Sequence, residues 1–228
     1  MKTITDSKDN IVKLAADLIC GLVESKPDAV LALSVGNTQA PIYNELTRRS
    51  VSFKDVRIFS VCEYSGLAEG DTHSCGNILK ELAEMLGTDK VFVPTEENAE
   101  EFEQLIEDCG GIDLAVLGIG LNGHIGFNEP GSFYVSRTRK VQLSDSTKRM
   151  KAPTFGGVEN VPDHAVTMGI KTICDAKNVI LTAFGGEKAD IIYKLVYGKT
   201  ESYVPAAMLQ MHMNMTLLLD NEAAAKLG

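Results

Sequence analysis

The 228-residue sequence predicts an α/β fold with a mostly parallel β-sheet. Short apolar runs, typical of strands that are covered on both faces, recur at residues 29–35, 56–61, 114–117, 179–183 and 216–219. Amphipathic stretches lie between these runs, near residues 78–86, 97–109 and 187–197. Strands that alternate with helices favour parallel pairing through right-handed crossovers. We expect a single domain over residues 1–228, because the sequence contains neither an internal repeat nor a linker rich in Pro, Gly and Ser.

The first element along the chain is predicted to be a helix. Asp6 or Ser7 can cap its N-terminus, and Lys26-Pro27 ends it. Its apolar positions form one stripe, which comprises Ile11, Ala15, Leu18, Ile19, Leu22 and Val23. The apolar run 29–35 follows as the first buried strand. A second helix is expected from about Pro41, after the loop Gly36-Asn37-Thr38-Gln39.

The later elements continue this alternation. Strands are expected at 56–61, 114–117, 179–183 and 216–219, with helices near 78–86 and 187–197. The acidic stretch 96–108 predicts a helix with a solvated charged face, because its apolar positions are Phe102, Leu105 and Ile106. The segment Ser144-Asp145-Ser146-Thr147 is typical of a helix cap.

Composition and charge exclude several classes of function. With 44% hydrophobic and 23% charged residues, the chain has an ordinary globular composition. Its 22 basic and 31 acidic residues give a net charge of −9, so the basic excess of a duplex nucleic-acid-binding protein is missing. The apolar runs fall far short of the roughly 20 residues that span a bilayer, and the segment MKTITDSKDN has no apolar core of a secretion signal. We therefore expect a cytoplasmic protein that binds neither nucleic acid nor membranes.

The cysteines are scattered along the chain, at Cys20, Cys62, Cys75, Cys109 and Cys174. An odd number without a C-x-x-C pair argues against a disulfide framework and against a zinc site. Most of these cysteines are expected to be small buried hydrophobic residues. Because no His, Cys and Asp residues cluster at ligand spacing, no metal ion is expected.

Ligands of open parallel sheets bind beyond the carboxyl ends of the strands. This rule selects the loops at residues 36–39, 62–64, 118–131 and 185–188. The segment Gly118-Ile119-Gly120-Leu121-Asn122-Gly123 satisfies the dinucleotide pattern G-x-G-x-x-G. A dinucleotide site is not expected, because that pattern must open a helix, whereas these glycines continue into a second glycine-containing stretch that ends at Pro130-Gly131.

The same loop favours acid–base chemistry. His124 and Glu129 flank a short glycine-containing turn, so an imidazole and a carboxylate can meet in one concave site. Histidine titrates near neutral pH, and a carboxylate partner fixes its tautomer and raises its basicity. A surface histidine beside an unrelated glutamate is the alternative. His73, His164 and His212 lack such surroundings and are expected to be structural or solvated.

Other segments are suited to an anionic ligand. Backbone amides ahead of a helix can hold a phosphate, so the loop that begins with Gly36, Asn37 and Thr38 is a candidate. Lys188, at the start of the helix after Gly185-Gly186, can supply a compensating charge, and a solvated lysine is the alternative. A basic cluster opposed only by Asp145 also suggests an anionic ligand, or else a solvated face; it comprises Arg137, Arg139, Lys140, Lys148, Arg149 and Lys151.

The loop from Leu117 to Gly131 resembles the active-site loop of the glucosamine-6-phosphate deaminase/isomerase family. The resemblance covers nearly the whole chain, because further family motifs are found in family order: Val51-Ser52-Phe53-Lys54, Glu63-Tyr64-x-Gly66-Leu67, Ser136-Arg137-Thr138-Arg139 and Val161-Pro162-x-x-Ala165-x-Thr167-x-Gly169. The string N-G-H-I-G-F-N-E-P-G is highly specific. Related 6-phosphogluconolactonases share the fold and the Gly-His but lack the F-N-E-P continuation, which disfavours a lactonase-type hydrolase.

The resemblance implies a doubly wound, Rossmann-like α/β domain that binds a phosphorylated amino sugar and requires no metal ion or organic cofactor. Members of the family open the sugar ring, move a proton between C2 and C1, and release ammonia from C2 to leave a ketose phosphate. By position, His124 would handle the ring-oxygen proton, Glu129 would orient it, and Asn122 would be the third member of this relay.

The resemblance also implies a set of substrate-binding residues. Gly36, Asn37 and Thr38 match the phosphate loop of the family, and Lys188 matches a phosphate-binding lysine. Gly118 matches a loop glycine that lines the sugar.

The most consequential departure from the family pattern is Cys62, which stands where the family has an aspartate as its C2 proton base. A carboxylate is fully ionised at neutral pH, whereas an ordinary thiol, with a pKa of about 8.5, is mostly protonated. Cys62 could still act as a base if a neighbouring positive charge or a helix N-terminus lowered its pKa. Glu63 is not expected to substitute, because adjacent side chains on an extended segment point in opposite directions.

The other departures fall on phosphate binding. Asn37 and Gln39 replace a small residue and a proline in the phosphate loop. Pro153 replaces an arginine that grips the phosphate in the glucosamine enzymes, and compensation is expected from a basic residue nearby: Lys148, Arg149 or Lys151.

We therefore predict a deaminase/isomerase for glucosamine 6-phosphate or galactosamine 6-phosphate. The galactosamine 6-phosphate branch of the family also departs from the family pattern around the arginine. The alternative is a sugar-phosphate-binding or regulatory protein that has lost deamination; a variant or engineered enzyme would also carry Cys62. The chain ends at Gly228, so the C-terminal extension that holds part of the allosteric site in hexameric members is expected to be absent. This predicts a monomer or a small homo-oligomer.

Overall fold

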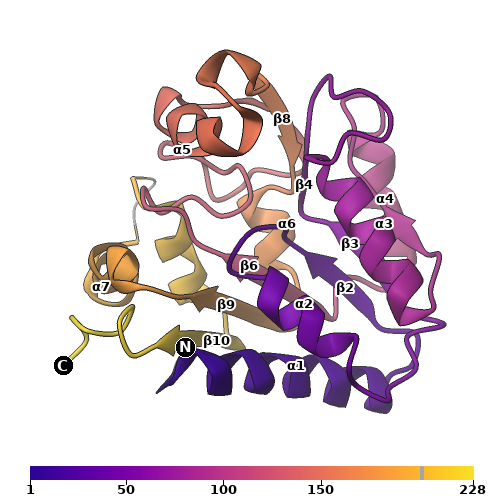
Figure 1. The fold of residues 1–228 in the computed structure, drawn as a ribbon, viewed down its shortest axis with the longest axis horizontal. Helices are drawn as coiled ribbons and strands as arrows, with labels where there is room; N and C mark the ends of the chain where they lie inside the picture. Colours follow the sequence, from indigo (N-terminus) through magenta and orange to yellow (C-terminus); the bar gives the residue numbers. More distant parts are fainter. Residues whose placement is uncertain (201–202) are drawn as a thin grey trace.

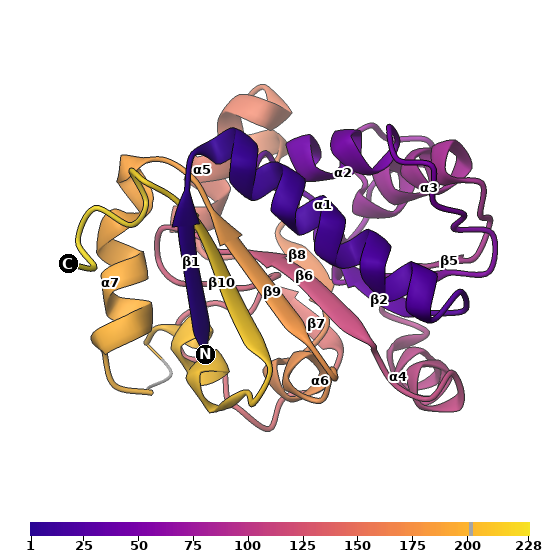
Figure 2. The same cartoon turned by 90° about the horizontal axis from the view of Figure 1, so that it is seen from below.

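The computed structural model describes residues 1–200 and 203–228. In these ranges the main sheet has seven strands, all paired in parallel (Figures 1 and 2). In spatial order they are β1 (Lys2–Asp6), β10 (Met215–Asp220), β9 (Val179–Ala183), β6 (Leu114–Gly118), β2 (Val30–Leu33), β3 (Arg57–Ser60) and β5 (Val91–Phe92). The predicted α/β class is confirmed, and the predicted apolar runs correspond to β2, β3, β6, β9 and β10.

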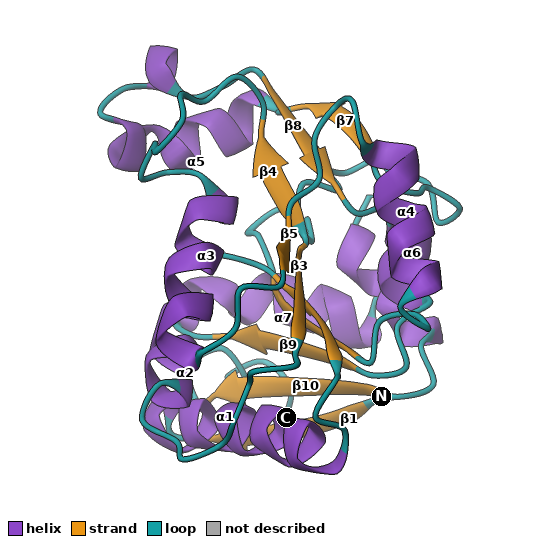
Figure 3. Cartoon of the chain, turned by 90° about the vertical axis from the view of Figure 1, so that its right-hand side faces the viewer, coloured by secondary structure: helices purple, strands orange, loops and turns teal. Residues whose placement is uncertain are grey.

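Helices cover both faces of this sheet, which Figure 3 shows edge-on. One face packs against α1 (Lys8–Ser25), α2 (Ala40–Leu46) and α3 (Cys75–Leu86). The other packs against α4 (Ala99–Asp108), α6 (Ile170–Cys174), α7 (Ala189–Tyr197) and the 3-10 helix η3 (Pro205–Met211). Leu31 of β2 enters the α1 side of the core, and its neighbour Ala32 enters the α4 side. Because side chains alternate along a strand, burial on both faces explains the unbroken apolar runs.

The N-terminal helix is preceded by a strand that was not predicted. β1 has the largely polar sequence KTITD, and it pairs only with β10 at the edge of the sheet as far as the described residues show. Such a mostly exposed edge strand requires no apolar run and therefore leaves no clear sequence signal. Ser7, one of the two predicted caps, does cap α1, since its Oγ accepts a hydrogen bond from Asn10 N at 3.3 Å. No helix in the described ranges is long and apolar enough to cross a bilayer.

A small antiparallel sheet was also not predicted. It joins β4 (Cys62–Tyr64), β8 (His164–Thr167) and β7 (Arg139–Gln142), and a separate small core lies beside it under α5 (Asp145–Phe155) and the 3-10 turn η1 (Val158–Asn160). Strands of three or four residues are too short for a periodic pattern to reveal them. Ser144 caps α5 as its sequence indicated, because its Oγ accepts from Thr147 N at 3.2 Å.

The direction of the crossovers changes between β2 and β6. From β2 the chain moves outward to β3 and β5, and it then returns to β6 on the other side of β2. Ligands of doubly wound sheets bind at such a switch point, beyond the carboxyl ends of the two strands. The loops that begin there contain residues 36–39 and 119–131, two of the segments selected from the sequence.

Candidate active site

The loop after β6 is a compact backbone turn and does not open a helix. Gly120 N donates to the carbonyl of His124 at 2.9 Å, which closes the loop on itself. Gly123, between them, has a φ of 85°, which glycine adopts without strain. Farther along, the buried Asn128 side chain donates to the carbonyl of Met168 at 2.8 Å and so fixes the loop to the end of β8. This conformation agrees with the prediction that the glycines do not form a dinucleotide site.

Glu129, Asn122 and His124 form a continuous hydrogen-bonded chain within this loop. Asn122 Nδ2 donates to Glu129 Oε2 at 2.8 Å, and Asn122 Oδ1 lies 2.7 Å from His124 Nδ1. The direct separation of His124 Nδ1 from Glu129 Oε2 is 4.0 Å. The carboxylate therefore acts on the imidazole mainly through the amide, and the three predicted relay residues lie together.

The chain of hydrogen bonds fixes the tautomer of His124. A carboxylate only accepts hydrogen bonds, so Asn122 turns its NH₂ toward Glu129 and its oxygen toward the imidazole. His124 Nδ1 then donates, and Nε2 keeps the lone pair that a general base needs. Burial lowers the pKa of His124 to about 4; Glu129 opposes this shift, and Lys151 and Lys188 reinforce it. The imidazole is therefore neutral at pH 7.

Replacing Asn122 by aspartate is expected to raise the pKa of His124 by about one unit or more, because a carboxylate beside an imidazole favours the charged ring. The measurement is an NMR titration of protein carrying ¹³C-labelled histidine, in which the His124 signal is assigned by its loss in His124→Gln. Asn44→Asp, on the exposed surface of α2, is the matched control and leaves the midpoint unchanged. An unchanged His124 midpoint in Asn122→Asp would show that the amide does not set the charge of the ring.

The loop after β2 lies at the same end of the sheet. Gln39 N and Ala40 N both donate to the carbonyl of Gly36 at 3.0 Å, which bends the chain into α2. In the described part of the chain, the amides of Gly36, Asn37 and Thr38 donate to no acceptor. These three predicted phosphate-loop amides are therefore available to a ligand.

Gln39 connects this loop to the two central strands. Its side chain is buried, and its Nε2 donates to Thr182 Oγ1 of β9 at 3.3 Å. A Cβ atom on Gly118, at the end of β6, would lie 2.7 Å from the same nitrogen. A side chain at position 118 would therefore displace the Gln39 amide from Thr182.

Lys188 points into the site and is not a solvated lysine of a first turn. It ends the 3-10 turn η2 (Gly186–Lys188), and its Nζ donates to the carbonyl of Ile119 at 2.8 Å. Burial lowers the pKa of Lys188; Glu187 opposes this shift and Lys151 adds to it. The ammonium groups of Lys188 and Lys151 thus both act on the loop that carries His124.

Several members of the predicted basic cluster are held by partners within the protein. Acidic residues distant in the sequence pair with several of them: Arg137 with Asp175, Lys140 with Glu96, and Lys148 with Asp163. Arg139 instead donates to Asn128 Oδ1 at 3.0 Å and supports the loop. Three members of the cluster are therefore neutralised by tertiary ion pairs, and an anionic ligand near the cluster stays a prediction. Of the three residues expected to compensate for Pro153, Lys151 is the one whose charge acts on His124.

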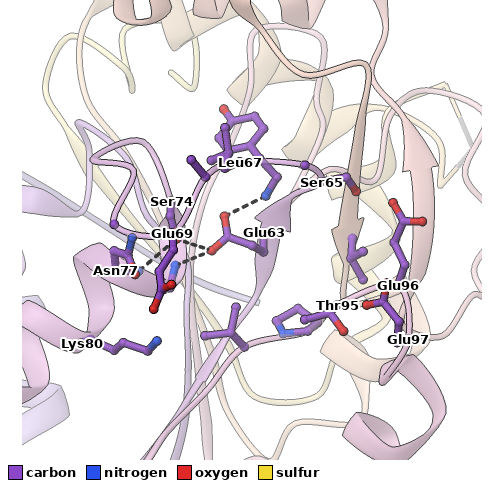
Figure 4. A pocket seen from close by; sticks show the side chains of 18 residues that line it. Glu63, Ser65, Leu67, Glu69, Ser74, Asn77, Lys80, Thr95, Glu96 and Glu97 are labelled. Atoms are coloured by element: carbon purple, nitrogen blue, oxygen red, sulfur yellow. Dashed lines mark hydrogen bonds between the residues drawn. The ribbon is translucent and has the colours of Figure 1, made fainter.

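The side chains of Cys62 and Glu63 lie in different surroundings, as the alternation of side chains along a strand predicts. The Glu63 carboxylate accepts hydrogen bonds from Ser74 Oγ, Cys75 N and Gly76 N at 2.6, 3.0 and 2.7 Å, which caps α3. It lines a cavity of about 480 Å³ on that side of β4 (Figure 4). Cys62 is buried in the small core with Phe127. Glu63 is thus committed to the helix, in agreement with the expectation that it does not replace the missing aspartate.

Three features of the site were not found from the sequence. Gln39 lies in the predicted phosphate loop and replaces a proline there, but no sequence pattern indicates that its buried amide joins three elements. Gly120 was treated as part of a motif, whereas it lies directly against the imidazole of His124. Cys75 was treated as an ordinary buried cysteine, although it lies beside Cys62. For Cys75 a signal existed: Ser74 is a helix-capping residue ahead of an amphipathic stretch, which places the start of α3 at Cys75.

The fold and the relay are those of an α/β enzyme that carries acid–base side chains at the switch point of its sheet. Comparison with known proteins agrees with this class. The family described as glucosamine-6-phosphate isomerases/6-phosphogluconolactonase matches residues 4–218. The chain belongs to this family.

Individual relatives cover nearly the whole chain. The sequence is 39% identical to a glucosamine-6-phosphate deaminase of Bacillus pumilus over 96% of this chain and 97% of that protein. It is also 39% identical to glucosamine-6-phosphate deaminase 2 of Bacillus subtilis, with 98% and 96% covered. A solved structure described as a monomeric glucosamine-6-phosphate deaminase superposes with a TM-score of 0.95, at 34% identity over 99% of this chain and 100% of that one. A 6-phosphogluconolactonase of Trypanosoma brucei superposes with a TM-score of 0.80 at 19% identity, over 100% and 98% of the two chains, which shows a shared fold.

Proposed function

We propose that this protein deaminates an amino-sugar 6-phosphate, with glucosamine 6-phosphate as the first substrate to test and galactosamine 6-phosphate as its epimeric competitor. The reaction consumes one water and yields a ketose 6-phosphate and ammonia. The observation that carries the proposal is the Glu129–Asn122–His124 chain, which leaves a neutral imidazole with a free Nε2 at the switch point. The deaminases named above, at 39% identity over nearly the whole chain, support the same assignment.

Ring opening is assigned to His124. Its Nε2 takes the proton of the anomeric hydroxyl and returns a proton to the ring oxygen as the C1–O5 bond breaks. Glu129 stabilises the transient imidazolium through Asn122, which stays hydrogen-bonded to both partners. Glu129 Oε1 is buried and has no hydrogen-bond partner within the described residues. A buried carboxylate oxygen of this kind needs a donor, and a hydroxyl of the bound sugar would supply it.

Proton transfer between C2 and C1 is assigned to Cys62. As a thiolate it would remove the C2 proton and return it to C1, and ammonia would then leave from C2 after addition of water. Phe127, three residues beyond His124, packs with Cys62. Cys62 therefore contacts the loop that carries His124. The helix N-terminus beside Cys62 is already occupied by the Glu63 carboxylate. The Glu63 carboxylate therefore reduces the stabilisation that the helix dipole would give to a thiolate at Cys62.

Phosphate binding is assigned to the loop after β2 and to Lys188. The amides of Gly36, Asn37 and Thr38 offer hydrogen-bond donors. Lys188 offers a positive charge, and its ammonium group is positioned by the hydrogen bond to the carbonyl of Ile119. Lys151 contributes a second charge, which acts on both His124 and Lys188. In a protein of net charge −9, two ammonium groups at one site favour a dianionic ligand.

The test is ammonia release from the two epimeric substrates by the natural chain, by Cys62→Asp and by the uncharged Cys62→Asn. We expect turnover of glucosamine 6-phosphate by the natural chain and faster turnover by Cys62→Asp, because a carboxylate is ionised at pH 7 without assistance. Cys62→Asn separates the effect of charge from that of size, and it is expected to be inactive.

Activity of Cys62→Asp alone would overturn the assignment for the natural chain. The site would then be intact except for its base, and a sugar-phosphate-binding protein would be the better description. Absence of ammonia release from every form would overturn the deaminase assignment itself.

A further inference from the structure

The structure brings two cysteines of different elements together at the position of the proposed proton base. Cys62 is the first residue of β4 and Cys75 is the first residue of α3. Both are free thiols in the same small core, with 6% and 5% of their surfaces exposed.

Their proximity is enforced by Glu63, the middle residue of β4. The carboxylate of Glu63, next to Cys62, accepts from Cys75 N at 3.0 Å and from Gly76 N at 2.7 Å. Gly76 allows this approach, because a Cβ atom there would lie 3.0 Å from Glu63 Oε2. The start of α3 is thereby held against the start of β4.

The two residues share one small core, close enough for Cys62 to affect the ionisation of Cys75. The neighbouring Cys62 side chain and burial hold the pKa of Cys75 well above its usual value, so Cys75 keeps its proton beside the Cys62 sulfur. The remaining cysteines lie elsewhere: Cys20 packs in the core under α1, while Cys109 and Cys174 pack against the core on the opposite face of the main sheet. Cys62 and Cys75 are therefore a pair, and the chain offers internal controls.

We propose that Cys62 and Cys75 are a reversible modification site, at which a hydroperoxide closes a disulfide that switches the protein off. Disulfides in reducing compartments are mostly transient and regulatory, and a second thiol next to an oxidised one prevents irreversible oxidation. The loss of activity on closure rests on the proposed function, in which Cys62 is the base. The formation of the bond does not depend on it.

The chemistry balances in two steps. The Cys62 sulfur attacks a peroxide oxygen and the O–O bond breaks. The leaving oxygen takes up the Cys62 proton and departs as water, a sulfenic acid remains on Cys62, and Cys75 keeps its own proton at this stage. Cys75 then gives up that proton and attacks the Cys62 sulfur; the S–S bond forms, the S–O bond breaks and a second water leaves. Two thiols lose two electrons and two protons in total, and hydrogen peroxide is reduced to two waters. A dithiol reductant reverses the change.

The test is intact and peptide mass spectrometry of the full chain after treatment with hydrogen peroxide. Trypsin releases residues 58–80 as one peptide, because no Lys or Arg lies between Arg57 and Lys80, and this peptide contains Cys62 and Cys75 alone among the cysteines. We expect it to lose about 2 Da, and cleavage before Asp71 to leave two peptides joined by the disulfide. Dithiothreitol should restore the original mass.

Matched variants make the result specific. In Cys75→Ser the same peptide should gain about 16 Da or more instead of losing mass, because no second thiol captures the sulfenic acid. Cys109→Ser should behave like the natural chain. If the natural peptide keeps both thiols, or gains oxygen as Cys75→Ser does, the proposal is overturned.

Activity is the second readout. Ammonia release by the oxidised natural chain should fall at least about tenfold and return with dithiothreitol, whereas Cys75→Ser that has been oxidised to the sulfinic acid should not recover its starting activity. A disulfide that forms without loss of activity would overturn the switch. A chain that shows the mass change but never releases ammonia would overturn the proposed function and leave the modification site standing.

Discussion

Replacing Cys62 by serine is expected to lower kcat for deamination by about 100-fold or more, the usual scale for losing a general base. A serine hydroxyl has nearly the size of a thiol, but it does not ionise at any accessible pH, so it cannot remove the C2 proton. Because the side chain volume is preserved, KM should change little. Initial rates with glucosamine 6-phosphate, measured on the purified variant, give both constants.

The matched control for this prediction is Cys174→Ser, on α6 and packed against a different part of the core. It should retain kcat, which separates loss of the base from a general effect of cysteine replacement. Thermal unfolding of both variants checks that the fold persists. An unchanged kcat in Cys62→Ser would mean that another group moves the proton, and the thiol-base assignment would fall.

The parts of the fold that the sequence predicted are those in which burial produces a pattern. β2, β6 and β9 appear as unbroken apolar runs because helices cover both faces of the sheet, and α1 and α4 show one apolar stripe each. β1 and the small sheet of β4, β7 and β8 lack such a pattern, since they are short or largely exposed. Their pairing is decided by contacts between residues far apart in the chain.

The same distinction holds for the site. His124 and Glu129 were found because they lie in one loop, where sequence spacing limits their separation in space. The role of Gln39 depends on Thr182, 143 positions away, and the ion pairs of Arg137 and Lys140 also join distant segments. No local pattern encodes such contacts. The position of Asn122 between the two relay residues likewise depends on a backbone turn that only the coordinates show.

Replacing Gly120 by alanine is expected to lower kcat by about 100-fold, on the scale of a displacement of about 1 Å at a reacting group. A Cβ atom at this position would lie 2.2 Å from Cε1 and 2.3 Å from Nδ1 of His124. Contacts this short force the imidazole to move. The backbone itself tolerates alanine, because Gly120 does not have a positive φ. The imidazole would then leave the Asn122 oxygen, and Nε2 would lose its fixed direction.

Gly21→Ala provides the matched control, because the added methyl group on α1 meets nothing within 4 Å. Both variants add one methyl group, so a loss of activity in Gly120→Ala alone reports the position of the imidazole. The His124 NMR signal supplies a readout that does not depend on the substrate: its pKa should rise from about 4 toward the ordinary value as the ring leaves its buried position. If Gly120→Ala keeps its full kcat and the pKa of His124 does not change, the loop accommodates the methyl group. The close packing of Gly120 on His124 then has no part in orienting the base.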